Sequence, residues 1–389
     1  ICYISRAFEE DVDIQSKAAC AAKIIGSVTN DFRLREGNPV VLVAAFSSNF
    51  KSDDCLEKVM QRVKAIQYED IRSIASDHKA WWKAFWSESY VDIQDSIIEK
   101  QYYLSNYGMA SFSRDEDFPP SIFGTCVTQE RSYWSGDYHL NYNHFAPYYS
   151  LFSSNHIGQA IPCNIPILAQ QERGEYYSDK VCGIKGGILL PVGAGPLGIE
   201  TTRRNELMEE HRAEWIRKGN VEDEGLFWGQ KSNSSYCVVN MAMHFYTTYD
   251  EEYTRKYYPF VKGVATFWEN YLSWEDERYV IYNDAIHEGT VGTMNPILSL
   301  GLVRLVLHTA IDMSNALKVD AERVERWQHI IENLSAYTYQ ERKGKKVFRY
   351  TEKGTEWWRD NTLGIQHIYP AGQIGLDSDP ELLRVAHNT

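Results

Sequence analysis

One stretch of ten residues, Trp134 to Asn143, contains a tryptophan, a carboxylate, an imidazole and two amides (WSGDYHLNYN). Proteins often bind sugars with such a set, because an aromatic ring covers the apolar face of the sugar while polar groups hydrogen-bond its hydroxyls. A helix is expected to begin directly afterwards, at His144. The stretch therefore predicts a sugar-binding site, with Trp134, Asp137 and His139 as substrate-binding candidates.

The two amides are candidates for catalysis. Asn141 and Asn143 are two residues apart, a spacing that places both side chains on one face of an extended segment. Two amides on one face can bind a water molecule or a pair of sugar hydroxyls. An amide does not titrate in the useful pH range, so it needs a carboxylate behind it to activate water. The alternative is that both amides only cap the following helix or turn, and the sequence favours neither interpretation.

A candidate acid lies in the polar loop 283–289 (NDAIHEG), between two predicted helices. Loops on a rigid scaffold often carry functional groups. If Glu288 loses solvent there, its pKa rises and it can protonate a glycosidic oxygen as a general acid. The neighbouring His287 is a further substrate-binding candidate. The alternative is a solvated loop carboxylate, which is the usual state of a glutamate.

The sequence lacks the motifs of several other classes of enzyme and binding protein. The sequence has no HExxH spacing of a zinc protease, no EF-hand loop and no G-x-S-x-G nucleophile elbow. The glycine-rich segment 186–198 is not followed by the Lys-Ser/Thr pair of a phosphate-binding loop. We therefore predict neither a metal ion nor a cofactor.

Composition limits the class of protein further. The 389 residues carry a net charge of −13, which argues against a nucleic-acid partner. No apolar run approaches the roughly 20 residues of a membrane span. The seven cysteines include no C-x-x-C pair, which favours free, buried thiols over a disulfide framework. Nothing in the sequence determines the oligomeric state.

The chain is expected to have three regions. The β-branched run 39–47 predicts a buried strand, residues 53–66 predict a helix capped by an aspartate, and residues 68–89 predict a second, aromatic-rich helix. We interpret residues 1–66 as the tail of an N-terminal β-sandwich whose earlier strands are missing. Residues 67–94 would be a helical linker, and residues 95–389 a helical catalytic domain.

The third region is predicted to be a helical toroid. Helices are expected at 96–109, 144–153, 165–180, 232–249, 251–273, 293–317, 321–336 and from Pro380. Helix 251–273 has a single apolar stripe, whereas helix 293–317 is apolar on every side and so should be buried on every side. These two types predict two concentric layers, as in an (α/α)6 barrel. Such a barrel has six helical hairpins, or twelve helices, and about eight are predicted here, so we expect its C-terminal third beyond Thr389. Residues 337–351 predict a β-hairpin that turns near Lys343-Gly344.

Four segments resemble, in the same order, segments of glycoside hydrolase family 95. They are residues 77–93 (DHKAWW to VDI), 134–162, 284–334 and 367–382 (HIYPAGQI to DPEL). The resemblance implies a mainly α protein with a β-sandwich, a helical linker and an (α/α)6 barrel. It also implies an enzyme that hydrolyses terminal α-L-fucosides or related α-L-galactosides of a glycan with inversion, outside the cytoplasm.

The resemblance implies roles for individual residues. Asn141 and Asn143 would activate the attacking water, and Glu288 would be the general acid. His139 would contact the sugar, and His367 is a further substrate-binding candidate. The acid loop differs from the Ser-Pro-Glu pattern of the family. The family's aspartate that polarises the amides has no match in this sequence and is expected past Thr389.

Two alternatives stay open on the same scaffold. A catalytically inactive homologue would bind carbohydrate through the tryptophan and the amides without cleaving it. A glycoside phosphorylase would need a basic phosphate pocket, and this acidic sequence shows none that is obvious.

Overall fold

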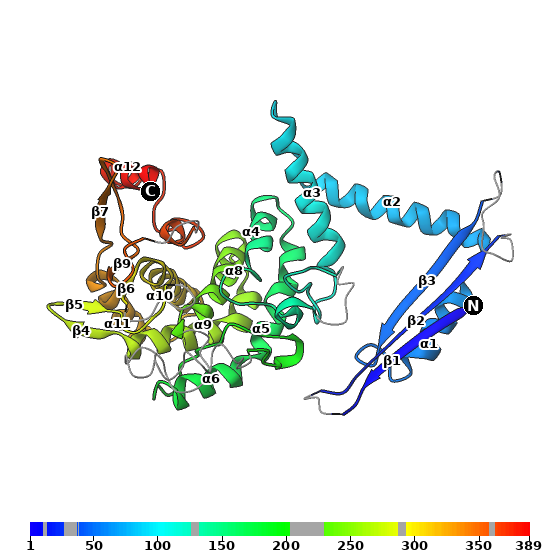
Figure 1. Ribbon diagram of the computed structural model, residues 1–389, viewed down its shortest axis with the longest axis horizontal. Coiled ribbons are helices and arrows are strands. Elements are labelled where there is room, and N and C mark those ends of the chain that lie inside the picture. Colours follow the sequence, from blue (N-terminus) through cyan, green and yellow to red (C-terminus); the bar gives the residue numbers. More distant parts are fainter. Residues whose placement is uncertain are drawn as a thin grey trace. The chain divides into compact units, whose positions relative to one another are not determined.

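The structure is a computed structural model of the 389-residue chain. It describes residues 1–10, 14–26, 37, 39–125, 132–202, 229–286, 293–357 and 362–389. The chain divides into two compact units, Ile1–Tyr90 and Val91–Thr389 (Figure 1). Each unit has its own apolar core. This division places the predicted linker helix in the first unit.

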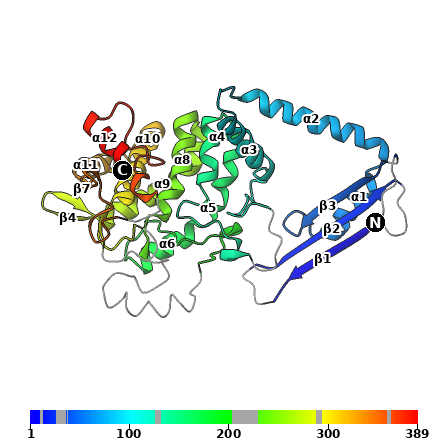
Figure 2. The ribbon, with the colours of Figure 1, turned by 45° about the horizontal axis from the view of Figure 1, so that its top comes forward.

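The first unit contains an antiparallel sheet with a helix along one face (Figure 2). Its elements are β1 (Cys2–Phe8), β2 (Ser16–Ile25), β3 (Val41–Ser48) and α1 (Cys55–Ala65). Ala21 and Val43 alternate toward the helix and bury Val59 against the sheet. Asp54 caps α1 by accepting a hydrogen bond from the backbone N–H of Glu57. The predicted strand over 39–47 and helix over 53–66 are therefore confirmed, but the expected burial of the strand is wrong, because Val43 is its one buried residue.

The opposite face of this sheet is apolar and exposed. Ile4, Leu42 and Phe46 are 70%, 69% and 71% exposed. Ile4 pairs with Cys20, which pairs with Phe46, so these side chains form one row across the strands. Among the described residues of this unit there is one sheet, and the β-sandwich stays a prediction.

The linker helix follows as η1 (Tyr68–Asp70) and α2 (Ile71–Glu88), in agreement with the prediction over 68–89. Its aromatic side chains pair at i, i+4 spacing. Trp81 stacks on Phe85 with ring centroids 5.6 Å apart, and Trp82 stacks on Trp86 at 5.8 Å. The aromatic residues therefore stabilise the second half of α2 through contacts with one another.

The second unit is mainly helical. Its helices are α3 (Ser96–Phe112), α4 (Ala146–Ser153), α5 (Ile165–Ala169), α6 (Gln171–Lys180), α8 (Asn233–Thr248), α9 (Glu251–Tyr271), α10 (Ile297–Leu317), α11 (Ala321–Asn333) and α12 (Pro380–Asn388). Each corresponds to a predicted helix. The predicted helix 165–180 is divided at Gln170 into α5 and α6. Helix α10 begins at Ile297 rather than at 293 because the preceding three residues form a strand.

The helices divide into buried ones and ones that cover them, as the distribution of apolar residues along each helix predicts. Helix α10 is buried around most of its circumference and packs against α8, α9 and α11 (Figure 1). Helix α9 buries its predicted stripe, including Phe260, Val264 and Phe267, and leaves charged residues outside. This layering is compatible with a helical toroid.

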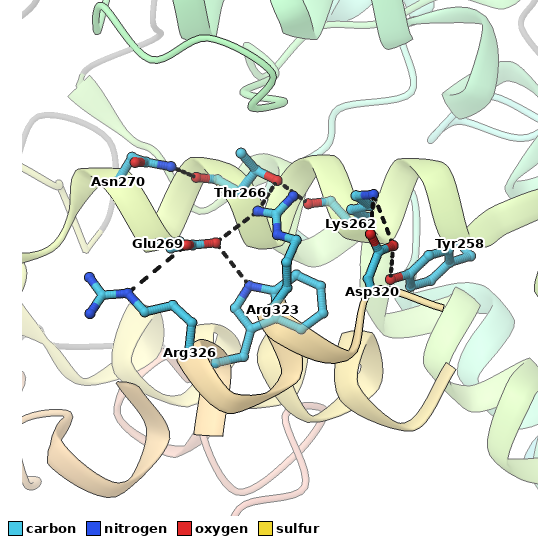
Figure 3. Close-up of polar contacts among 9 residues, drawn as sticks. Tyr258, Lys262, Thr266, Glu269, Asn270, Asp320, Arg323 and Arg326 are labelled. Carbon is cyan, nitrogen blue, oxygen red and sulfur yellow. Dashed lines mark hydrogen bonds and ion pairs between the residues drawn. The ribbon is translucent and has the colours of Figure 1, made fainter. Parts of the chain in front are cut away.

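Polar contacts join the covering helices α9 and α11 (Figure 3). Lys262 Nζ lies 2.8 Å from both carboxylate oxygens of Asp320, and the Tyr258 hydroxyl donates to the same carboxylate over 2.7 Å. Further along, Arg323 donates to Glu269 over 2.7 Å. These groups pair with one another, so the network serves packing between the two helices.

Three short antiparallel strand pairs lie between the helices. They are β4 (Ser273–Glu275) with β5 (Arg278–Val280), β6 (Met294–Pro296) with β9 (Thr351–Lys353), and β7 (Tyr339–Arg342) with β8 (Lys345–Phe348). The third pair is the predicted hairpin, and its turn residues Lys343 and Gly344 have φ values of 50° and 71°. A left-handed conformation at both turn positions is typical of a two-residue hairpin loop.

Two expectations from composition have structural counterparts. In the described parts of the chain the six cysteines form no disulfide bond, as predicted, but the expected burial holds only for Cys55, Cys163 and Cys237. Helix α10 is long and apolar enough to cross a membrane, although the sequence analysis found no apolar run of the length of a membrane span. Most of α10 is buried within the second unit, as expected for the central helix of a helical domain.

Candidate active site

The segment from residue 137 to residue 141 alternates between apolar side chains in the core and polar side chains. Tyr138 and Leu140 are buried, and their backbone N–H groups donate to the carbonyls of residues 194 and 192 over 2.8 and 2.6 Å. Asp137, His139 and Asn141 are the polar residues of this segment, and its backbone is not a regular extended strand, because His139 has a φ of 38° and a turn begins at residue 140. All three are at most 9% exposed. Three polar side chains of one short segment are thus largely buried.

The chain turns at Tyr142, between the two asparagines. Residues 140–145 form a turn, and Tyr142 has a φ of 117°. The expectation that Asn141 and Asn143 lie in one extended segment is therefore wrong. Asn143 lines a hollow whose lining does not include Asn141.

An exposed tryptophan lies beside the buried polar group. Trp134, in the short helix η2 (Tyr133–Gly136), is 56% exposed and stacks on the imidazole of His139, with centroids 4.7 Å apart. His139 Nδ1 lies 3.1 Å from Asp137 Oδ2. A carboxylate at Nδ1 favours the tautomer whose Nε2 is an acceptor. This is the aromatic platform with convergent polar groups that the sequence predicts.

A second amide orients Asn141. Gln230 is 1% exposed and lies just before α8. Its Oε1 accepts a hydrogen bond from Asn141 Nδ2 over 3.3 Å, and its Nε2 donates to Ser232 Oγ over 3.1 Å. Because both ends of the Gln230 amide are bonded, it fixes the orientation of the Asn141 amide.

The loop that carries the predicted acid begins beside Gln230. Asp284 is fully buried, and its Oδ1 accepts the backbone N–H of Lys231 over 2.8 Å. The backbone N–H of Ala285 donates to the carbonyl of residue 229 over 3.3 Å. Thr293 is tied to the same place, because its hydroxyl donates to the Asp284 carbonyl. His287 and Glu288 lie outside the described residues.

A hollow of about 320 Å³ adjoins Asn143. Its walls come from the end of α3, residues 120–124 and the start of α4, and they include Phe112, Phe123, Asn143, His144 and Tyr148. Its volume is in the range of small-ligand sites, and most of its lining side chains are apolar. His144 Nε2 donates a hydrogen bond to the Cys163 carbonyl over 3.0 Å, and the ring is neutral because burial lowers its pKa to about 4. The hollow is therefore an uncharged space beside a predicted catalytic amide.

His367 lies in the core and not in this group. It is fully buried, with its ring 4.7 Å from Tyr337 and 4.5 Å from Phe348. It also packs closely on α10, where a Cβ added at Gly301 would come within 2.5 Å of the His367 Cβ. Burial, and secondarily the charge of Arg304, lowers the His367 pKa to about 3, so the ring is neutral. This position does not suit the substrate contact expected from the sequence.

A comparison with protein families decides which class of enzyme this site belongs to. The model of the glycosyl hydrolase family 95 catalytic domain matches residues 57–389, most of the chain. The chain belongs to this family. The suspected resemblance is thereby confirmed, and the second unit is a family 95 glycosidase domain whose substrate class is a glycan. A comparison with curated proteins found no match.

In this family 95 chain the structure brings together part of the predicted site. Trp134, Asp137 and His139 contact one another, and Asn141, two residues further along the chain, is buried as well. Sequence reasoning missed Gln230. A signal existed, since residues 229–233 (GQKSN) form a polar run directly before an apolar helix, as residues 137–143 do before α4.

Asp284 was also missed, although it lies in the loop 283–289 that the sequence analysis chose for its glutamate. Among the described residues, Asp137 and Asp284 are the two buried carboxylates. Both lie within this site: one contacts His139, and the other accepts from the residue after Gln230.

Proposed function

We propose that this family 95 chain is an inverting glycosidase that removes a terminal α-L-fucosyl or α-L-galactosyl residue from a glycan. The observation that supports this most is the exposed Trp134 ring over the buried pair of His139 and Asp137, next to Asn141. An aromatic face beside fixed hydrogen-bonding groups suits one sugar ring with its hydroxyls.

In this proposal the aromatic and polar groups bind the sugar. Trp134 covers its apolar face. His139 accepts a hydrogen bond from a sugar hydroxyl through Nε2, because Asp137 favours the proton on Nδ1. His287 contributes a further hydrogen bond from the loop that begins at Asp284.

Water is the nucleophile in this proposal. Asn141 and Asn143 orient a water molecule against the anomeric carbon, on the face opposite the leaving group. As the water oxygen bonds to that carbon, the glycosidic C–O bond breaks, and Glu288 gives its proton to the departing oxygen. The water's proton passes to a carboxylate, because an amide is not basic enough to keep it. The product then has the opposite anomeric configuration.

The contact between Asn141 and Gln230 gives the first amide a fixed direction before substrate binds. Such preorganisation lowers the cost of placing water in line with the bond that breaks. The start of the 283–289 loop, at Asp284 and Ala285, is tied to the segment that holds Gln230, which supports a role for this loop at the site.

A screen of terminal α-L-fucosides, α-L-galactosides and other glycosides tests the proposal, with and without phosphate. We expect phosphate-independent release of the terminal sugar. Glu288→Gln should lose about 10²–10⁴-fold in turnover, the usual contribution of a general acid. The matched control is Glu341→Gln, at an exposed position on β7, which should keep full turnover.

Other outcomes would replace the proposal. Sugar binding without any turnover would mean an inactive carbohydrate-binding homologue. Turnover that requires phosphate would mean a phosphorylase. Unchanged turnover in Glu288→Gln would remove that residue from the mechanism.

Two broader expectations from the family belong to the proposal as well. We propose that the helices close into a six-hairpin toroid, which the layering around α10 supports. We also propose that the protein acts outside the cytoplasm, which cell fractionation would test.

A further inference from the structure

A fully buried lysine lies next to Gln230 in the chain. Lys231 is 0% exposed, and among the described residues it is the one buried lysine. It directly follows the glutamine whose amide orients Asn141. Burying an ammonium group is unfavourable unless strong partners replace its water. The partners of Lys231 therefore identify the part of the chain that it holds.

The Lys231 ammonium group binds the start of the loop 283–289. Its Nζ donates to the backbone carbonyl of Asn283, and also to the carbonyl of Gly229 over 3.4 Å. In the other direction along the loop, the backbone N–H of Lys231 donates to Asp284 Oδ1 over 2.8 Å. Residue 231 thus bonds two consecutive residues of the loop, one through its side chain and one through its backbone.

An aromatic ring completes the surroundings of the ammonium group. Lys231 Nζ lies 5.3 Å from the centre of the Tyr271 ring, at the end of α9. Such a contact between a cation and a ring is strongest away from water. The Tyr271 hydroxyl in turn donates to the backbone carbonyl of Tyr282 over 2.8 Å. Residues 282, 283 and 284 therefore each accept a hydrogen bond from Tyr271 or Lys231.

Gln230 and Lys231 connect two parts of the proposed site. Gln230 holds the Asn141 amide, and the adjacent Lys231 holds the start of the loop that continues to Glu288. In an inverting glycosidase the acid and the group that activates water stand roughly 6.5–9.5 Å apart. A misplacement of about 1 Å can cost about a hundredfold in rate. Two adjacent buried residues, each bonded to one part, suit the task of keeping this separation constant.

We infer that Lys231 is a positioning residue that fixes the start of the acid-bearing loop relative to Gln230 and Asn141. This inference rests on the proposed function, in which Glu288, four residues after Asp284, is the general acid. Because Lys231 is fully buried, it acts through the loop and not by contact with the sugar. Its loss should therefore weaken protonation of the leaving group more than the other steps of the reaction.

Two aryl glycosides with the same terminal sugar test this inference. The leaving group of the phenyl glycoside needs a proton, whereas that of the dinitrophenyl glycoside departs without one. Lys231→Met keeps the apolar volume but has no N–H group in its side chain. Its kcat/KM should fall about 10–100-fold more on the phenyl than on the dinitrophenyl glycoside, within the contribution of a well-placed general acid.

A double variant tests whether Lys231 acts through the proposed acid. In the Glu288→Gln background, Lys231→Met should lower kcat/KM on the phenyl glycoside by less than about threefold, because the group that it positions is already removed. Tyr271→Phe loses only the hydroxyl that bonds residue 282. It should show a bias of the same sign, and it decides the question if Lys231→Met does not fold.

The matched control is Lys262→Met. Lys262 lies on α9, as Tyr271 does, but its Nζ bonds Asp320 (Figure 3). This control should show no bias between the two substrates, even where it lowers the melting temperature. Equal losses on both substrates in the deciding variant, no loss on either, or an undiminished loss in the Glu288→Gln background would overturn the inference.

Hydrogen exchange separates the inference from the proposed function. If no glycoside is cleaved, the proposed function fails, but the amide of Ala285, which donates to the carbonyl of residue 229, still reports on the start of the loop. This amide should exchange at least about tenfold faster in Lys231→Met than in the parent, and at the parent rate in Lys262→Met. Tyr271→Phe again replaces a Lys231→Met that does not fold. An unchanged exchange rate in the deciding variant would contradict the inference.

Discussion

Replacing Asp137 by asparagine should weaken catalysis while leaving the fold intact. The Asp137 carboxylate is 6% exposed, and its Oδ2 lies 3.1 Å from His139 Nδ1. The carboxylate can only accept a hydrogen bond, so it favours the imidazole tautomer with its proton on Nδ1. An asparagine has the same shape, but it is a weaker acceptor, and its NH2 group favours the other tautomer.

The size of the effect follows from the change in this hydrogen bond. A hydrogen bond to a charged group contributes about 1.5–3 kcal/mol and a neutral one about 0.5–1.5 kcal/mol. The midpoints of these ranges differ by about 1.25 kcal/mol, which corresponds to roughly an eightfold change in an equilibrium or rate constant. We therefore expect Asp137→Asn to lower kcat/KM about eightfold, and more if the tautomer changes.

The assay is kcat/KM on the best glycoside of the panel, with the melting temperature measured in parallel. Asp179→Asn is the matched control, because Asp179 lies on α6 and pairs with the exposed Lys180. It should keep the activity of the parent. A value within twofold of the parent for Asp137→Asn would refute the role given to the His139 pair. A loss that is matched by a large drop in melting temperature would assign Asp137 to folding instead.

Three further predictions concern stability. The folded-state pKa values of His144 and His367, about 4 and about 3, lie below the ordinary value of 6.5, so the unfolded chain takes up protons first as the pH falls. Urea unfolding should therefore show that the free energy of unfolding falls from about pH 6.5 downward, by about 3 kcal/mol for His144 at pH 4. His367→Leu should reduce the dependence of this free energy on pH. A free energy of unfolding that does not change with pH would contradict the burial of both histidines. Gly301→Ala should lower stability by about 1–3 kcal/mol, because the added Cβ would lie 2.7 Å from the His367 backbone. Gly108→Ala is the control and should not destabilise the protein, because nothing lies within 4 Å of the added Cβ. Equal melting temperatures of the two variants would contradict the packing of Gly301 on His367. Glu269→Gln should lower the free energy of unfolding by about 1–2 kcal/mol, because Glu269 accepts hydrogen bonds from an arginine and a tryptophan of α11 (Figure 3). An unchanged unfolding midpoint would mean that these hydrogen bonds do not contribute to the stability of the unit.

Local patterns in the sequence predicted the elements of the fold well. The stripe of α9, the all-round apolar surface of α10 and the hairpin turn at Lys343-Gly344 are each set by residues close together in the chain. The strands β4, β5, β6 and β9 were not predicted, because three residues are too few for an alternation to appear.

The sequence predicted only the contacts of the candidate site that join residues close together in the chain. Trp134, Asp137 and His139 lie within six residues of one another, and their contact follows from one short segment. The bond from Asn141 to Gln230 joins residues 89 positions apart, and the packing of Tyr149 on Tyr369 joins α4 to the segment before α12. No periodicity in the sequence reports such contacts. The role of His367 stays a prediction, because a buried histidine of the core and a ligand-binding histidine have the same sequence signature.

The configuration of the first product tests the central claim most directly. The claim is that water attacks from the side of Asn141 and Asn143, opposite the leaving group. Proton NMR during the first minutes of hydrolysis of an α-L-glycoside should show the β-anomer of the free sugar before mutarotation. First formation of the α-anomer would mean a retaining mechanism and would contradict the role given to the two asparagines.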